Sequence, residues 1–79
     1  MSFGFKPNPK AQVELKFREL FGREFKCSVT GARDGRTYRT AVAVEGEVIA
    51  TASHSDWRKS YKMLALEIEK LFSEGVALV

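Results

Sequence analysis

Three basic residues near the start of an expected helix are the strongest candidates for a functional role. Arg58, Lys59 and Lys62 fall within two turns, on an arc separate from the apolar residues of that helix. A helix N-terminus carries unsatisfied N–H groups and the positive end of the helix dipole. Cations placed there repel the dipole and one another, so folding alone gives little reason for them. The spacing therefore predicts an anion-binding surface, with an ordinary solvated helix face as the alternative.

A second basic cluster lies in the middle of the chain. Residues 31–35 have the sequence Gly-Ala-Arg-Asp-Gly, which is typical of a turn-forming loop. This loop would display Arg33 and Arg36, with Arg39 directly after it. A solvated turn has the same composition, so this cluster alone does not separate a functional role from a structural one.

The residues needed for catalysis are few. A nucleophile and its base would require Cys27 or a serine beside His54. Cys27 falls on the inward side of an expected strand as a small buried residue, and His54 stands between two serines as a surface residue or nucleic-acid contact. One histidine and one cysteine cannot build a structural zinc site. We expect no enzyme, no metal or other cofactor, and no small-molecule substrate.

Composition limits the class of protein further. The 79 residues suffice for one small domain, and 13 Lys+Arg against 10 Asp+Glu give a net charge of +3. This mild excess permits a nucleic-acid partner without requiring one. A single cysteine cannot form an internal disulfide, which indicates a reducing, cytoplasmic location. No apolar run approaches the roughly 20 residues of a membrane span, so no membrane partner is expected.

The two helices that must position these residues follow from the apolar spacing. Asn8 followed by Pro9 is typical of a helix start, and Gly22 of a helix end. Between them one face carries Val13, Phe17, Leu20 and Phe21. A last helix is expected over about residues 57–72, after several N-cap candidates among residues 53–56. Its apolar stripe comprises Trp57, Tyr61, Leu64, Ala65, Ile68, Leu71 and Phe72.

Between the helices the period of apolar residues changes to two, which predicts β-strands. Strands are expected over residues 25–30, 38–44 and 47–52, with a hairpin turn at Glu45 and Gly46. Because the connections are short, neighbouring strands should be antiparallel. Each helix has one apolar stripe, so both should cover the same face of the sheet.

The order of elements defines the fold class as α+β. We expect an α-β-β-β-α arrangement, with a three-stranded antiparallel sheet and two helices packed on one face. The other face would display the small residues Ala41 and Ala43. Residues 9–74 would form this domain, residues 1–8 a flexible arm and residues 75–79 a short tail.

Three stretches of the chain follow the pattern of one known family. Residues 8–13, Asn-Pro-Lys-Ala-Gln-Val, are similar to the opening of its first helix. Residues 36–50 match its second and third strands without a gap. Residues 58–62, Arg-Lys-Ser-Tyr-Lys, are similar to its K-K-x-A-K signature. On these motifs the chain, from residue 8 to about residue 72, resembles a double-stranded RNA-binding domain of the ribonuclease III type.

This resemblance implies that the protein binds double-stranded RNA. Such domains recognise A-form shape and phosphates, largely independently of base sequence. The first helix and the loop between the first two strands enter successive minor grooves, and the start of the second helix contacts the phosphates between them. The RNA contacts implied for this chain are Gln12 and Glu14, then Arg33 and Arg36 of the loop, and Arg58, Lys59 and Lys62.

Two departures from the family pattern keep a second function class open. Asp34 stands where the loop of the family has a histidine, and Leu15 where the first helix carries a glutamate. Leu15, Met63 and Leu66 also fall outside the apolar stripes and are expected on the surface. The alternative is a domain of this fold that forms a homodimer or binds a partner protein, with weak or lost RNA binding. The basic residues of the last helix favour RNA, because a pure interaction module has no reason to keep them.

Overall fold

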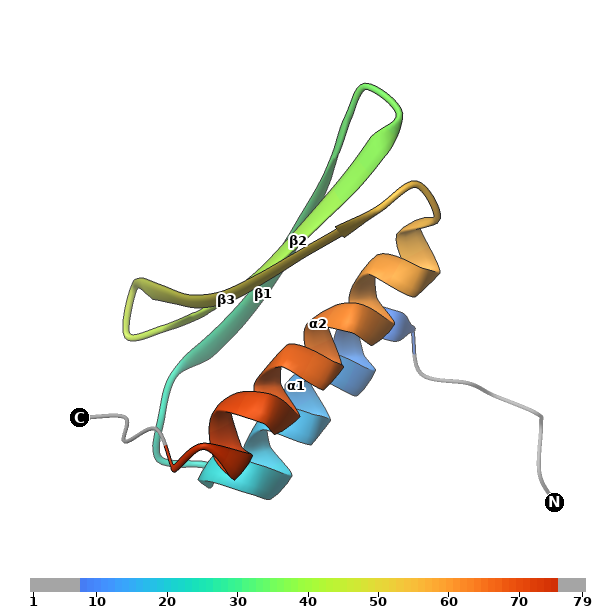
Figure 1. Ribbon diagram of the computed structural model, residues 1–79. Coiled ribbons are helices and arrows are strands. Elements are labelled where there is room, and N and C mark those ends of the chain that lie inside the picture. The colour runs from blue at the N-terminus through green and yellow to red at the C-terminus, as the bar shows by residue number, and fades with distance from the viewer. Residues whose placement is uncertain (1–7, 76–79) are drawn as a thin grey trace, which may run out of the picture.

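The computed structural model describes residues 8–75 and has the predicted order of elements (Figure 1). These elements are α1 (Pro9–Phe21), β1 (Cys27–Asp34), β2 (Thr37–Val44), β3 (Glu47–His54) and α2 (Trp57–Ser73). The expected arm and tail lie outside the described residues, except for Asn8 and Gly75.

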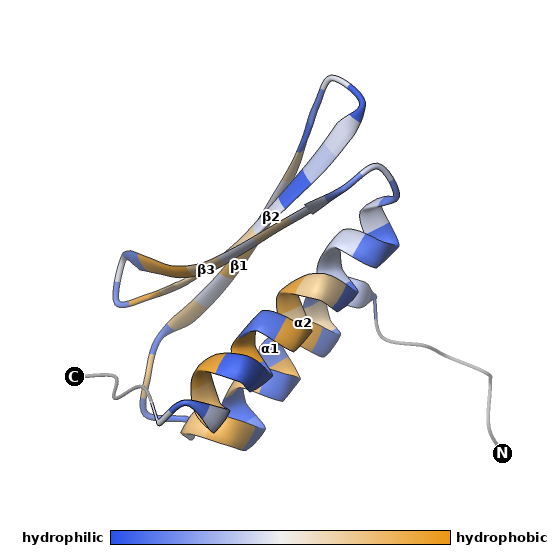
Figure 2. Cartoon of the chain, in the orientation of Figure 1, coloured by the Kyte–Doolittle hydropathy of each residue, from blue (hydrophilic) through white to orange (hydrophobic). Residues whose placement is uncertain are grey.

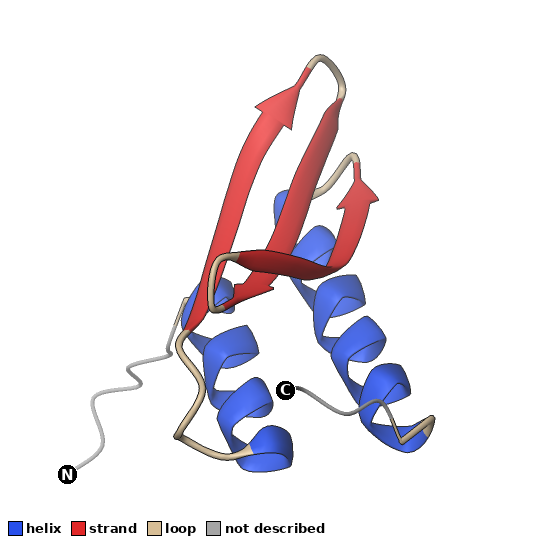
Figure 3. Cartoon of the chain, turned by 90° about the vertical axis from the view of Figure 1, so that its left-hand side faces the viewer, coloured by secondary structure: helices blue, strands red, loops and turns tan. Residues whose placement is uncertain are grey.

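The three strands form one antiparallel sheet in the order β1-β2-β3. Both helices lie on the same side of this sheet (Figures 1 and 3). The predicted α+β class, with two helices packed on one face, is therefore confirmed. The pairing of β2 with β3 shifts between Val42 and Ala43, which pair with Ala50 and Val48. This shift leaves Ile49 as the extra residue of a bulge in β3.

Local signals set the N-terminal ends of both helices. The side chain of Asn8 accepts a hydrogen bond from the N–H of Ala11 at 2.8 Å, and Pro9 occupies the first helical position. Asp56, one of the predicted cap candidates, accepts hydrogen bonds from two N–H groups in the first turn of α2. At the other end of α1, Gly22 has a φ of 99°, which favours glycine. These ends therefore lie where the sequence predicts them.

The turn between β2 and β3 is also confirmed. Glu45 and Gly46 have φ values of 53° and 85°, the combination found in type I′ turns. Glu45 is held there by Lys26: its N–H donates to the Lys26 carbonyl at 3.0 Å, and its carboxylate accepts from the Lys26 N–H at 2.9 Å. These two bonds help a glutamate to occupy a position that normally favours asparagine or glycine.

The predicted loop over residues 31–35 is wrong. β1 remains paired with β2 as far as Asp34, which lies opposite Thr37. The turn consists of Gly35 and Arg36, and Gly35 has a φ of 64°. The first two strands therefore form a long hairpin with a tight turn, in place of two shorter strands and a five-residue loop.

Gly31 lies inside β1 for a reason that the local sequence does not contain. A Cβ atom added at this position would collide with the hydroxyl of Tyr61, which belongs to α2. It would also lie 2.7 Å from the hydroxyl oxygen of Tyr38 on β2. Gly31 therefore leaves space for two tyrosines and does not mark a turn.

Other element bounds differ from the prediction by one or two residues. β1 begins at Cys27, β2 begins at Thr37, β3 continues to His54 and α2 continues to Ser73. For β2 and β3 the reason is that pairing with a neighbouring strand extends a strand beyond the residues whose apolar alternation reveals it.

The core lies between the helices and the sheet. Its buried apolar residues are Val13 and Phe17 of α1, Val29, Val42 and Val44 of the sheet, and Tyr61, Leu64 and Ile68 of α2. Figure 2 shows hydrophobic and hydrophilic bands alternating along both helices, as expected for helices with one buried face. The predicted stripe of α2 is therefore correct at its centre. At its ends, Trp57 and Phe72 remain partly exposed.

Two buried hydroxyl groups hold the start of α2 against the sheet. Thr40 of β2 and Ser60 of α2 are both buried, and their hydroxyl oxygens lie 3.1 Å apart. The Ser60 hydroxyl lies 2.9 Å from the Tyr38 carbonyl, and the Thr40 hydroxyl lies 3.2 Å from the carbonyls of Ala52 and Ser60. Each hydroxyl has one proton and so donates to one acceptor at a time. The network fixes the basic turn of α2 relative to β2 and β3.

Candidate nucleic-acid interface

The basic residues predicted to contact RNA lie at one end of the molecule. The N-terminal ends of α1 and α2 lie at the end where the β1–β2 hairpin projects (Figure 1). From the hairpin, Arg33 extends to the connection before α2, where its Nη2 lies 3.5 Å from the carbonyl of Ser55, a long hydrogen bond. From α1, Gln12 lines a groove together with Arg58 and Lys62. Three segments that are distant in sequence therefore meet on this surface.

The groove between α1 and α2 has a volume of about 240 Å³. Arg58 and Lys62 are one helical turn apart, so both charges border the same groove. Buried Val13 and Tyr61 also contribute to its lining. Lys59 is exposed on the same turn of α2 but does not line the groove. An anionic group in this groove would therefore meet two cations above an apolar base.

The backbone at the start of α2 is already hydrogen-bonded. The Asp56 carboxylate accepts from the N–H groups of Arg58 and Lys59, at 2.9 and 3.5 Å. These bonds, above all the one from Arg58, and the charge of Lys59 hold the pKa of Asp56 below its ordinary value of 3.8. The expectation that this helix end offers free N–H groups is therefore wrong for these two amides. An anion at this end would therefore be bound mainly by side chains.

His54 has a structural role in the same connection. Its Nδ1 atom accepts a hydrogen bond from the N–H of Asp56 at 2.9 Å, and its side chain is half-buried. The structure places this predicted contact next to the basic turn, where one ring nitrogen already stabilises the cap of α2.

The β1–β2 hairpin divides its charged residues between two faces. Arg33 lies on the helix side, with its guanidinium carbon 5.7 Å from the centre of the Tyr38 ring. Arg39 and Asp34 form an ion pair on the other face, with Nε and Oδ2 3.5 Å apart. Arg36 is exposed at the turn. Strand residues alternate between the two faces of a sheet. Arg33 shares a face with its partner Tyr38, so the next residue of β2, Arg39, lies on the opposite face.

The two predicted contacts of α1 have different neighbours. Gln12 borders the basic groove. Glu14 is half-buried, and its negative charge affects the thiol of Cys27 on β1, which is also half-buried. Burial above all, and then the negative charge of Glu14, raise the pKa of the Cys27 thiol, and the charge of Arg18 partly offsets them. The structure therefore brings Gln12 to the α2 cations and places Glu14 towards β1.

An aromatic cluster that the sequence analysis did not single out lies beside the basic residues. The Tyr38 ring centre is 5.8 Å from that of Tyr61 and 6.5 Å from that of Trp57. Burial, together with a 3.4 Å contact with the Tyr38 hydroxyl, raises the pKa of Tyr61 to about 12. The guanidinium carbon of Arg58 lies 4.8 Å from the centre of the Trp57 ring, a cation–π contact. The sequence signal for this contact is an aromatic residue directly before a basic pair.

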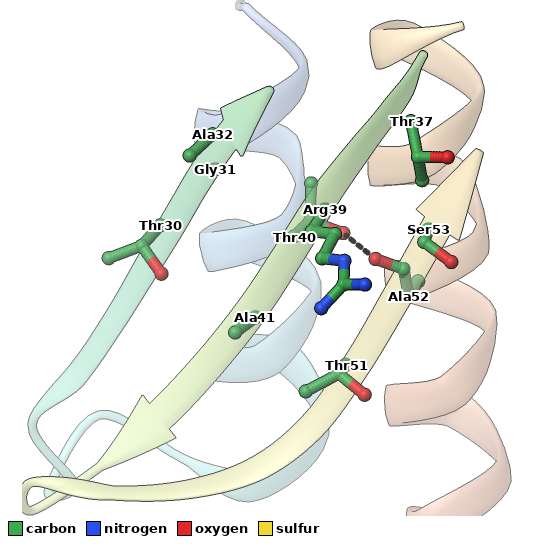
Figure 4. A pocket seen from close by; sticks show the side chains of 10 residues that line it. All are labelled: Thr30, Gly31, Ala32, Thr37, Arg39, Thr40, Ala41, Thr51, Ala52 and Ser53. Atoms are coloured by element: carbon green, nitrogen blue, oxygen red, sulfur yellow. Dashed lines mark hydrogen bonds between the residues drawn. The ribbon is translucent and has the colours of Figure 1, made fainter. Parts of the chain in front are cut away.

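Three apolar residues expected on the surface are exposed, as predicted. Leu15 on α1 is 50% exposed, and Met63 and Leu66 on α2 are 41% and 61% exposed. The sheet face away from the helices has an open hollow of about 710 Å³, lined largely by small and hydroxyl-bearing side chains (Figure 4). Thr30 and Ala41 lie on neighbouring strands of this hollow.

Over residues 8–75, no group of three or more histidine, cysteine, aspartate or glutamate side chains is placed to hold a metal ion. None of the described helices combines the length and apolar character that a bilayer crossing requires. No family model, curated protein or solved structure matches the chain. The geometry and charge of the basic end are therefore the basis for assigning a function.

Proposed function

We propose that the domain binds double-stranded RNA through its basic end, with little dependence on base sequence. The observation that carries this proposal is the convergence of three segments on one surface. Arg58 and Lys62 of α2 border a groove with Gln12 of α1, and Arg33 joins the β1–β2 hairpin to the connection before α2. Together they offer cations and a polar side chain at several separate points.

A duplex of RNA suits such separated contacts. A-form RNA displays 2′-hydroxyls across a wide, shallow minor groove, and proteins that recognise its shape contact successive grooves over about 16 bp. The N-terminal part of α1 and the projecting hairpin would supply the two outer contacts (Figure 1). The cations at the start of α2 lie between them and would bind the intervening phosphates.

Phosphate neutralisation sets the expected salt dependence of binding. The predicted contacts include five exposed cations: Arg33, Arg36, Arg58, Lys59 and Lys62. Each phosphate contact contributes about 0.7–0.9 to the slope of log affinity against log salt. The three cations of α2 alone predict a slope of about −2 to −3, and all five predict about −4. Such a slope is modest, so a second copy or a tethered partner would strengthen binding.

The test compares an RNA duplex of about 20 bp, longer than the roughly 16 bp of a typical contact, with a DNA duplex of the same sequence. Binding is measured over a range of salt concentrations. The variant Lys59→Gln/Lys62→Gln removes two charges from the basic end. The control Lys26→Gln/Lys70→Gln removes two exposed charges, one directly before β1 and one in the last turn of α2, so the change in net charge is the same. The start of β1 and the end of α2 lie away from the basic end (Figure 1).

We expect RNA to bind more tightly than DNA. The first variant should weaken binding to every duplex and reduce the salt slope by about 1.4–1.8, whereas the control should leave it nearly unchanged. Absence of RNA binding at low salt would overturn the proposal. Equal losses in both variants would overturn it as well, because binding would then follow net charge and not the basic end.

A protein-interaction module is the second candidate, favoured by Leu66. This residue is the most exposed of the large apolar residues in the described part of the chain, and Met63 lies three residues before it on α2. Light scattering at several protein concentrations tests this function. A homodimer that dissociates on Leu66→Ser, combined with no RNA binding, would favour the interaction module over the RNA-binding domain.

A further inference from the structure

Trp57 occupies an unusual position for the largest side chain of the domain. It is the first residue of α2 and 38% exposed, next to the basic turn. Its ring meets Tyr61 edge to face at 6.3 Å, and Tyr61 is the aromatic residue that enters the core. Tyr61 already fills the core beneath this end of α2, so core packing does not explain a large exposed indole here.

Arginine side chains accompany the aromatic rings at this point. The Arg58 guanidinium carbon is 4.8 Å from the centre of the Trp57 ring, and that of Arg33 is 5.7 Å from the centre of the Tyr38 ring. The rings of Trp57 and Tyr38 are themselves 6.5 Å apart. Two cation–aromatic pairs therefore lie side by side, one on α2 and one on the hairpin.

An exposed aromatic ring with arginines nearby suits one particular kind of RNA element. Unpaired bases stack on aromatic rings or on guanidinium planes, while nearby cations contact the flanking phosphates. A base within a duplex is already stacked on both faces, so it cannot use such a platform. A nucleotide that is unpaired, in a bulge or at the end of a duplex, can.

We propose that an unpaired nucleotide next to the duplex stacks its base on the Trp57–Arg58 pair. This inference rests on the proposed binding of double-stranded RNA and narrows its substrate class to duplexes that carry an unpaired nucleotide. The basic turn of α2 binds the duplex phosphates, and Trp57 stands at the start of that turn. Arg33 lies across from it on the hairpin and binds a phosphate beside the stacked base.

The test uses two RNA ligands that differ in one feature. One is a blunt duplex, and the other is the same duplex with a short single-stranded extension. Trp57 is the one tryptophan of the chain, so fluorescence excited at a wavelength that tyrosine does not absorb reports on this residue alone. We expect the extension to tighten binding by about tenfold, the gain of stacking one base, and to quench the fluorescence more strongly than the blunt duplex does.

Two variants separate stacking from a structural role. Trp57→Leu should lose the advantage of the extension while keeping the affinity for blunt duplex within about twofold. Trp57→Phe retains a ring and should keep part of the advantage, which covers the case that the leucine variant fails to fold. Phe72→Leu is the matched control, because Phe72 is an exposed aromatic residue at the other end of α2. It should leave both affinities unchanged.

The outcomes distinguish this inference from the proposed function. If both RNAs bind equally well with the same change in fluorescence, stacking on Trp57 is wrong and duplex binding stands. If Trp57→Leu weakens both RNAs by the same factor, Trp57 acts by holding Arg58, and the stacking inference is again wrong. If neither RNA binds, the proposed function itself fails.

Discussion

Replacing Gly31 by alanine should destabilise the domain, although the backbone at this position accepts an ordinary residue. In the absence of a steric conflict, a glycine-to-alanine change stabilises a protein by about 0.4–1 kcal/mol, because alanine restricts the unfolded chain. At Gly31 the new Cβ would collide with the Tyr61 hydroxyl and lie 2.8 Å from Cε1 of the Tyr38 ring. The sign of the effect therefore tests whether the two tyrosines pack as the structure shows.

The expected magnitude follows from the cost of overpacking. Inserting one carbon into a filled space costs about 1–3 kcal/mol, from which the gain of the alanine in the unfolded state is subtracted. A net loss of about 1–2 kcal/mol is a large part of the stability of so small a domain. It should lower Tm by roughly 4–16 °C.

Urea and thermal unfolding measure this change directly. Ala32→Ser is the control, because Ala32 is the next residue of β1 and is exposed; it should change stability by less than about 0.5 kcal/mol. In a Tyr61→Phe background the closest contact disappears, so the cost of Gly31→Ala should fall by at least about 0.5 kcal/mol. If Gly31→Ala proves as stable as the parent, the close approach of Tyr38 and Tyr61 to β1 is wrong.

Three further variants test the hydrogen bonds of Thr40, the Asp56 cap of α2 and the burial of Tyr61. Thr40→Val removes the hydroxyl that contacts Ser60 and two carbonyls, and should cost about 1 kcal/mol in urea unfolding; an unchanged midpoint would contradict the network. The pKa of Asp56 is lowered in the folded state, so its contribution to stability is present above its ordinary pKa of 3.8 and is lost as the pH falls through the lower folded value. Asp56→Asn keeps a cap residue, and the free energy of unfolding of this variant should depend less on pH in this acidic range. The pKa of Tyr61 rises from 10.0 to about 12 on folding, so its contribution to stability is complete below pH 10 and declines towards pH 12. Unfolding in alkali should show a smaller decline for Tyr61→Phe, and equal declines would refute this assignment.

The ends of the helices and the order of the elements could be predicted because their causes are local. Asn8 and Asp56 cap the backbone within three residues of themselves. The buried positions Val13 and Phe17 recur with the helical period on one face. Capping and periodicity depend on neighbours in the sequence, so the α-β-β-β-α order was already determined by the sequence.

The basic site was predicted in part. The sequence determined that Arg58, Lys59 and Lys62 share the start of a helix, because helical spacing places them there. It did not determine which of the hairpin residues would join them. That choice depends on the face of the sheet on which each residue lies. Arg33 lies on the helix side, whereas Arg39 pairs with Asp34 on the other side.

Contacts between distant segments decided the remaining features. The local sequence placed Gly31 in a turn. The position instead requires glycine because Tyr61, thirty residues later on α2, lies too close for a Cβ atom. Thr40 and Ser60 are polar residues that become buried because each supplies the hydrogen-bond partner of the other. Local propensity carries no information about a partner that only the folded chain brings near. The tertiary structure therefore decided the length of the hairpin, the contact of α2 with β2 through Thr40 and Ser60, and the aromatic cluster beside the basic turn.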